Sequence, residues 1–97
     1  MPNDTSDAEK RRKAAIRKAV ADELRAEAAR QDLDQGQVAE RVGMARATVN
    51  RLFKGSRPVD TEQLFAFADG LGFDAGDLID RAKRKYREQL RRLDTED

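Results

Sequence analysis

Apolar residues recur every three or four positions along most of this chain, which is the spacing of one buried face of an α-helix. In the first third they form a narrow stripe within a segment rich in Ala, Arg, Lys and Glu: Ile16, Val20 and Leu24. A capping pattern precedes this segment at residues 6–9, where Ser6 can close the first turn. We therefore expect one long helix that ends near Arg30 and whose turns around residues 10–13 project beyond the core.

Two short helices are predicted directly after the long one. Asp34 can cap a second helix over residues 35–42, and Gly43 provides its stop signal. The next apolar residues predict a third helix over residues 46–54, which ends at Gly55.

Two further helices complete the chain. The fourth opens at Asp60 or Thr61 and is expected to turn four residues toward the core: Leu64, Phe65, Ala68 and Leu71. Asp74 opens a fifth helix, which could continue to about residue 93. No segment has the pattern of a strand, so the expected fold class is all-α, with five helices of which the first and last are extended.

Composition fits one small helical domain with a modest core, since apolar residues make up 38% and charged residues 40% of 97 residues. The chain has no cysteine and no histidine, which removes the thiolate nucleophile, cysteine-bound zinc and the commonest general base. We expect no catalytic residue, no metal and no cofactor. The chain contains no apolar run long enough to span a membrane, and its first residues do not have the pattern of a secretory signal. We therefore expect a cytoplasmic protein with no membrane partner.

The net charge of +1 hides a strong segregation of charge along the chain. Residues 10–20 and 81–92 each sum to +6, whereas residues 59–80 sum to −6. The block at residues 46–58 holds basic residues and no acidic residue: Arg46, Arg51, Lys54 and Arg57. An uncompensated basic block of this kind indicates a nucleic-acid partner more strongly than the overall charge does.

Residues 38–55 read VAERVGMARATVNRLFKG and meet the requirements of two short helices that cross at a tight turn. Ala39 supplies a small residue for the crossing, and Gly43 tolerates a positive φ in the turn. Five apolar residues can bury the inner side of both helices: Val38, Val42, Met44, Val49 and Leu52. An ordinary helical hairpin does not require all three features at these spacings, so the pattern predicts a helix-turn-helix.

The stretch from Leu33 to Gly55, LDQGQVAERVGMARATVNRLFKG, resembles the helix-turn-helix of the phage lambda repressor family, the Cro and xenobiotic-response-element regulators. The resemblance covers about residues 16–80 and continues through four later positions: Pro58, Leu64, Leu71 and Leu78. It implies a five-helix domain that binds double-stranded operator DNA, usually as a homodimer, with the third helix in the major groove.

The resemblance also implies roles for eight residues. Gln35 would touch a backbone phosphate and brace the third helix. Three residues take the positions that face bases: Arg46, Ala47 and Arg51. Four others fall where the groove wall or the following loop meets DNA: Thr48, Asn50, Lys54 and Arg57. Helical geometry agrees in part, because burial of Val49 and Leu52 turns the row that includes Arg46 outward.

Two positions depart from the family pattern. Ala45 stands where many members have Ser or Thr, which removes a helix cap and puts one phosphate contact in question. Phe53 replaces the glutamate common in the wider family and is expected to be a core residue.

We expect three parts in the chain: residues 1–15 as a flexible or helical basic extension, residues 16–80 as the DNA-binding domain, and residues 81–97 as a helical extension with a possible dimerisation role. The basic run at residues 10–13 is either an accessory phosphate contact or a solvated helix end. An apolar stripe in the last helix needs a cover, which is either a partner subunit or the first helix: Ile79, Ala82, Tyr86, Leu90 and Leu93.

These features predict a sequence-specific transcriptional regulator, a phage or prophage-type repressor that binds a palindromic operator as a dimer. The alternative keeps the fold but is an antitoxin or adaptor whose main partner is another protein, bound through the C-terminal helix. An enzyme is a distant third possibility, because acidic residues such as Asp69 and Asp74 are explained as helix caps and solvated faces.

Overall fold

The computed structural model describes the backbone of residues 2–96 and the side chains of residues 7–93, and every regular element within this range is a helix. The helices are α1 (Pro2–Arg30), α2 (Gln35–Val42), α3 (Arg46–Lys54), α4 (Thr61–Leu71) and α5 (Ala75–Glu96). This confirms the predicted all-α fold class with five helices and extended first and last helices.

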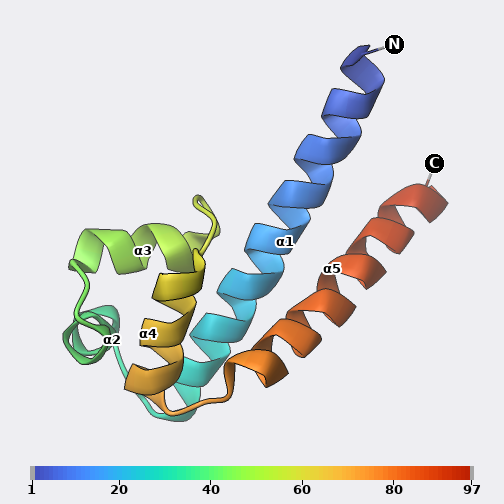
Figure 1. Ribbon diagram of the computed structural model, residues 1–97. Coiled ribbons are helices and arrows are strands. Elements are labelled where there is room, and N and C mark those ends of the chain that lie inside the picture. The colour runs from blue at the N-terminus through green and yellow to red at the C-terminus, as the bar shows by residue number, and fades with distance from the viewer. Residues whose placement is uncertain (1, 97) are drawn as a thin grey trace.

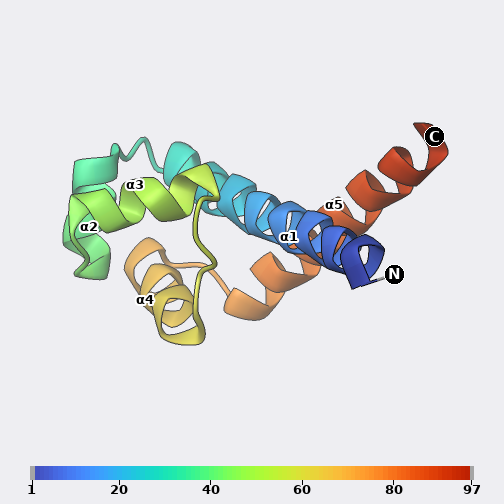
Figure 2. The same cartoon turned by 90° about the horizontal axis from the view of Figure 1, so that it is seen from above.

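The two long helices give the molecule an elongated shape of 45 × 21 × 19 Å. Helices α2, α3 and α4 gather around the C-terminal half of α1, and α5 runs back along α1 (Figure 1). Figure 2 shows from above that α1 and α5 then diverge, so both chain termini lie at the end remote from α2, α3 and α4. None of the helices in the described part of the chain is long and apolar enough to cross a membrane.

Aspartate caps begin α2 and α5 as predicted, and of the two candidates at α4 the cap is Asp60 rather than Thr61. At α2, the Gln37 N–H donates to Asp34 Oδ1 at 2.8 Å and the Asp34 N–H donates to Gln37 Oε1 at 2.9 Å, which completes a capping box. Asp60 forms the same arrangement at α4. Asp74 Oδ1 accepts a backbone N–H from the first turn of α5 at 2.9 Å.

Both long helices extend further than predicted. α1 begins at Pro2, so Ser6 lies within the helix rather than before it, and the Ser6 side chain lies outside the described residues. Proline is compatible with the first turn of a helix, and no glycine or proline follows it before Arg30, so nothing local stops the helix in between. α5 continues past residue 93 to Glu96.

The core is built around six fully buried side chains: Leu24, Val38, Val49, Leu52, Phe67 and Leu78. Phe53 joins them, with its ring stacked on Phe67 at a centroid distance of 5.9 Å, so its predicted core position is confirmed. The prediction that Phe65 faces the core is wrong, because its side chain is 55% exposed. Two residues along a helix differ by about 200°, so burial of Phe67 turns Phe65 to the opposite side of α4.

Helix α4 approaches the end of α2 closely at Gly70. A Cβ atom added there would lie 2.8 Å from the Arg41 carbonyl oxygen and 2.9 Å from a Val42 methyl carbon. A side chain at this position would therefore force the two helices apart. Since α2 supports α3, this close approach also fixes the helix-turn-helix on the rest of the core.

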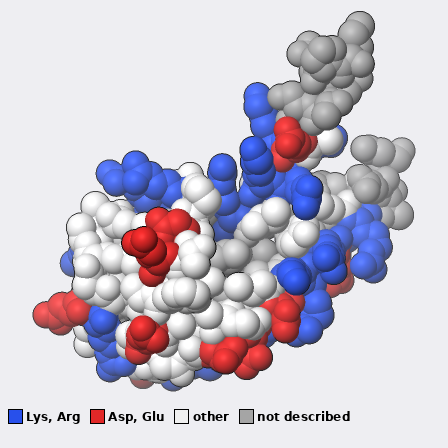
Figure 3. Space-filling model, in the orientation of Figure 1, with Lys and Arg blue, Asp and Glu red and all other residues white. Residues whose placement is uncertain are grey.

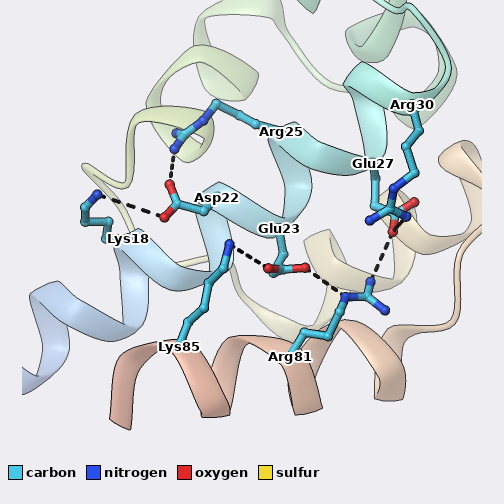
Figure 4. Close-up of polar contacts among 8 residues, drawn as sticks. All are labelled: Lys18, Asp22, Glu23, Arg25, Glu27, Arg30, Arg81 and Lys85. Carbon is cyan, nitrogen blue, oxygen red and sulfur yellow. Dashed lines mark hydrogen bonds and ion pairs between the residues drawn. The ribbon is translucent and has the colours of Figure 1, made fainter. Parts of the chain in front are cut away.

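The first part of α5 is held on α1 by buried carboxylates (Figure 4). Glu23 forms ion pairs of 2.8 Å with both Arg81 Nε and Lys85 Nζ, and Glu27 lies 3.1 Å from Arg81 Nη2. Burial raises the pKa of Glu23, but the hydrogen bonds from Lys85 and Arg81 outweigh it, so that the net pKa lies below its ordinary value. The pairing compensates two carboxylates that are buried in the α1–α5 interface.

The apolar stripe of α5 is covered only in part by α1. Ala82 is buried in the interface, and Tyr86 and Leu90 are half-buried. Ile79 and Leu93 remain 39% and 40% exposed. The first helix, one of the two predicted covers, therefore accounts for part of the stripe and leaves apolar surface open. The contacts between α1 and α5 lie on both sides of residue 80, where the sequence analysis divides the DNA-binding domain from the C-terminal extension. That division of the chain stays a prediction.

Candidate nucleic-acid interface

Helices α2 and α3 meet at the tight turn that the sequence predicts. Gly43 adopts φ 71° and ψ 34°, in the left-handed region that disfavours a side chain, and its N–H donates to the Ala39 carbonyl at 2.9 Å. The Met44 N–H donates to the same carbonyl at 3.1 Å. Ala39 is buried at the crossing, where a larger residue would separate the helices.

Helix α3 buries one side and exposes the other. Val49, Leu52 and Phe53 pack into the core. The opposite side is exposed at Arg46, Ala47, Arg51 and Lys54, and half-buried at Thr48 and Asn50. Arg57 is exposed in the loop that follows. The residues predicted from the sequence therefore lie on or beside the solvent face of one helix.

The start of α2 lies beside this face. Asn50 Nδ2 donates to Gln35 Oε1 at 3.0 Å, which joins α3 to the first residue of α2. The Arg46 guanidinium also lies over α2, since a Cβ atom on Gly36 would be 3.7 Å from Arg46 Nη1. Gln35 thus contacts α3 through Asn50, and its role toward DNA stays a prediction.

The electrostatics of this face are set by uncompensated cations. α3 contains no acidic residue, and none of its basic side chains forms an ion pair with another described residue. The same holds for Arg57 in the following loop. Figure 3 shows basic residues gathered along the upper edge of the molecule, over α3 and α1, while acidic residues lie over α4 and the first part of α5. A basic, solvent-facing helix of this kind attracts phosphate.

The far end of α3 is fastened to α1 by contacts that sequence reasoning missed. Arg25 Nη1 donates to the Phe53 carbonyl at the C-terminal end of α3. A Cβ atom on Gly55 would lie 3.4 Å from both the Arg17 carbonyl oxygen and Lys18 Cα. No local pattern marks these contacts, because their partners are far apart in the sequence. They hold α3 rigid relative to the long helix.

Ala45 leaves the start of α3 without a side-chain cap, as predicted. Its φ of −64° and ψ of 142° are those of a helix-capping residue, but its methyl group accepts no hydrogen bond. The N-terminal N–H groups of α3 that a cap would satisfy therefore lack a side-chain partner at this position.

Comparison with known proteins agrees with this geometry. The crystal structure of the clp gene regulator ClgR from C. glutamicum has a similar fold, with a TM-score of 0.66 and 24% sequence identity over 70% of this chain and 88% of that chain. No curated protein matches the sequence. A family model described as helix-turn-helix domain matches residues 19–82, which is more than half of the chain and includes both α2 and α3. The chain therefore belongs to the helix-turn-helix family of DNA-binding domains.

Proposed function

We propose that this protein is a sequence-specific transcriptional regulator of the lambda-repressor type, a phage or prophage repressor that inserts α3 into the major groove of its operator. The observation that carries the proposal is the exposed face of α3, whose cations form no ion pair with the described residues while its other side is buried. The basic side chains of such a helix can enter the groove without breaking an internal ion pair.

The roles of individual residues follow from their positions on this helix. Arg46 and Arg51 can read guanine with two parallel hydrogen bonds, and Ala47 can pack against a thymine methyl group. Thr48, Asn50, Lys54 and Arg57 are assigned to the groove wall and the phosphate backbone, and a further phosphate contact is assigned to Gln35. In this assignment, Gln35 also orients Asn50 through their hydrogen bond of 3.0 Å.

The repressor is proposed to bind as a homodimer, because one helix reads too few base pairs for useful discrimination within a genome. An apolar groove of about 240 Å³ supports this proposal. It lies between α1, α4 and α5 and is bordered by the exposed side chain of Ile79, with Ile16, Val59 and Tyr86 among its lining residues. A second copy would cover apolar surface that α1 leaves open.

The charge of α5 favours one orientation of this dimer. Its first two turns carry Asp77 and Asp80, whereas the following turns are strongly basic, with Lys83, Arg84 and Arg87. Two parallel copies would place like charges together. An antiparallel, two-fold arrangement instead places the acidic part of each helix beside the basic part of its partner.

Selection of duplexes from a random-sequence pool tests the proposed function. The expected result is enrichment of an inverted repeat whose half-sites are about one helical turn, ~34 Å, apart. The selected site placed over a promoter should then lower expression of a reporter when the protein is present. Recovery of no preferred sequence would contradict the proposal and favour the alternative, an antitoxin or adaptor that acts through another protein.

Sedimentation of an Ile79→Glu variant tests the proposed dimer surface. The variant should sediment as a folded monomer, because a buried, unpaired carboxylate opposes association. It should also lose cooperative binding to the selected inverted repeat while still occupying a half-site. Ala29→Glu, which adds the same charge at an exposed position of α1, should behave like the wild type. Dimerisation of Ile79→Glu would place the interface elsewhere.

A further inference from the structure

The N-terminal half of α1 is a basic helix that projects past α3 (Figure 1). Between Glu9 and Asp22 it contains no acidic residue and six basic ones: Lys10, Arg11, Arg12, Lys13, Arg17 and Lys18. All of these side chains are exposed except that of Arg17, which is half-buried. The basic surface of the molecule therefore continues beyond α3 along α1, as the upper edge of Figure 3 shows.

The contacts of α1 show which of these side chains lie on the side of α3. The loop after α3 rests on the α1 backbone at Arg17 and Lys18. Because a helix repeats every 3.6 residues, Lys13 and Lys10 lie on nearly the same side of α1 as Arg17, respectively one and two turns nearer the N-terminus. This row, defined as Lys10, Lys13 and Arg17, is the flank row.

Helix α5 occupies the opposite side of α1. Glu23 binds Arg81 and Lys85 there. Arg12 lines a pocket with Leu90 and Leu93 of α5 on that side as well. The pKa of the Tyr86 hydroxyl on α5 is lowered by Arg87 and, to a smaller extent, by Arg12. Arg12 therefore reaches toward α5 from α1. Arg12 and the flank row therefore point to different sides of one helix, although they are neighbours in the sequence.

The length of the flank row fits a stretch of DNA backbone. Lys10 and Arg17 are seven residues apart, which corresponds to ~10 Å along a helix at about 1.5 Å per residue. Successive base pairs advance by about 3.4 Å along the DNA axis, so the row spans roughly three base-pair steps. Because α1 is already helical and is fixed to α3, binding would not require this segment to fold.

We propose that the flank row of α1 binds backbone phosphates of the same DNA that α3 reads, just outside the base pairs that α3 contacts. This inference rests on the proposed function of α3 and adds a second contact surface to it. The flank row supplies affinity without sequence preference, since phosphates are the same at every base pair.

A double substitution, Lys10→Gln with Lys13→Gln, tests the proposal in the full-length protein. Its matched control is Arg12→Gln with Arg30→Gln, which removes the same charge from the α5 side of α1, since Arg30 lies about five turns from Arg12 on that side and pairs with Glu27. Binding to the selected duplex and to a scrambled duplex is measured by fluorescence anisotropy at several salt concentrations, and circular dichroism verifies that both variants fold.

The flank-row variant should bind both duplexes more weakly and by similar factors. The slope of its log affinity against log salt concentration should be shallower than that of the wild type by about 1.8, which is ~0.9 for each of two lost phosphate contacts. The stretch of DNA that the variant protects from hydroxyl radicals should also be shorter at the outer edge of each half-site. The control should keep the wild-type slope and footprint.

Two results would overturn the inference: a wild-type slope in the flank-row variant, or an equal loss of slope in the control. Either outcome leaves the role of α3 intact if the wild-type protein still prefers the selected duplex. If the wild-type protein prefers neither duplex, the proposed function is contradicted, and this inference falls with it.

Discussion

Arg46 and Arg51 project from the same exposed face of α3 but have different surroundings. Arg46 lies beside Gly36 at the start of α2, so a protein neighbour limits its orientation, whereas Arg51 is exposed in the second half of the helix. In the proposed complex both read a base, and Lys54, at the end of the helix, contacts the backbone.

We expect Arg46→Ala and Arg51→Ala each to weaken binding to the selected duplex by roughly 1–3 kcal/mol and to relax the preference at one base pair. Lys54→Ala should weaken all duplexes alike and reduce the salt slope by about 0.9. Titrations against duplexes with single base-pair changes measure both effects. An Arg51→Ala variant that keeps every base preference of the wild type would refute this assignment.

Ala45 offers a residue-scale test of helix capping. A serine here can accept a hydrogen bond from the first turn of α3, because the backbone already has the capping conformation. Ala45→Ser should raise the free energy of unfolding by about 0.5–2 kcal/mol in urea titrations. Ala47→Ser, inside the same helix and exposed, serves as the control and should lower stability slightly. Equal stability of the two variants would show that the N–H groups at the start of α3 already have another hydrogen-bond partner.

Glu23 makes the stability of the fold depend on pH. Its pKa is lowered in the folded protein, so its charged form stabilises the fold above the ordinary carboxyl pKa, and this contribution is lost as the pH falls through the lowered value. Glu23→Gln should cost about 1–3 kcal/mol at neutral pH, because Arg81 and Lys85 lose a charged acceptor.

Urea titrations at neutral and acidic pH test this contribution. The difference between Glu23→Gln and the wild type should shrink as the pH falls from roughly 5 to 3. Glu88→Gln is the matched control, since Glu88 pairs with Arg92 on the exposed surface of α5, where an ion pair contributes little. A difference that stays constant over this range would mean that protonation of Glu23 does not govern the α1–α5 contact.

At the scale of elements, Gly70 determines how closely α4 approaches α2. Gly70→Ala places a Cβ atom against backbone, which cannot move aside cheaply, so we expect a loss of roughly 1–3 kcal/mol in unfolding free energy. The control is Gly76→Ala, whose new Cβ would meet only the Asp74 carboxylate oxygen at 3.1 Å. Thermal unfolding compares the two, and a Gly70→Ala protein as stable as the control would contradict the close approach.

Helix starts, helix stops and the tight turn were predictable because their causes are local. Asp34, Asp60 and Gly43 act on backbone groups within four residues, so the sequence contains the whole interaction. The same reasoning identified the exposed face of α3, since burial of its apolar row leaves only one side free. The base and phosphate roles of individual residues on that face stay predictions.

Other elements could not be predicted, for two physical reasons. In LFAF, residues 64–67, apolar side chains occupy all four positions, so the pattern alone does not decide whether Phe65 or Phe67 enters the core. Long-range partners are also invisible in a single sequence, as with Arg25 and the Phe53 carbonyl or Arg81 and Glu23. Only packing of the whole chain brings these groups together.

At the scale of the whole molecule, charge is sorted by face. Basic residues occupy α3, the adjoining edge of α1 and the later turns of α5, and acidic residues occupy α4 and the start of α5 (Figure 3). The basic edge would therefore meet DNA first, while the acidic regions are repelled from it. The buried Glu23 and Glu27 keep α5 attached to α1 despite the many cations that α5 carries.

The most direct test of the account is the preference of the wild-type protein for one DNA sequence. Its affinity for the selected duplex and for a scrambled duplex of equal length and composition is measured over a range of salt concentrations. The account predicts a ratio of at least about 10³ near physiological salt, with both affinities falling as salt increases. A ratio near one at every salt concentration would contradict it, because the exposed face of α3 would then bind DNA without reading it.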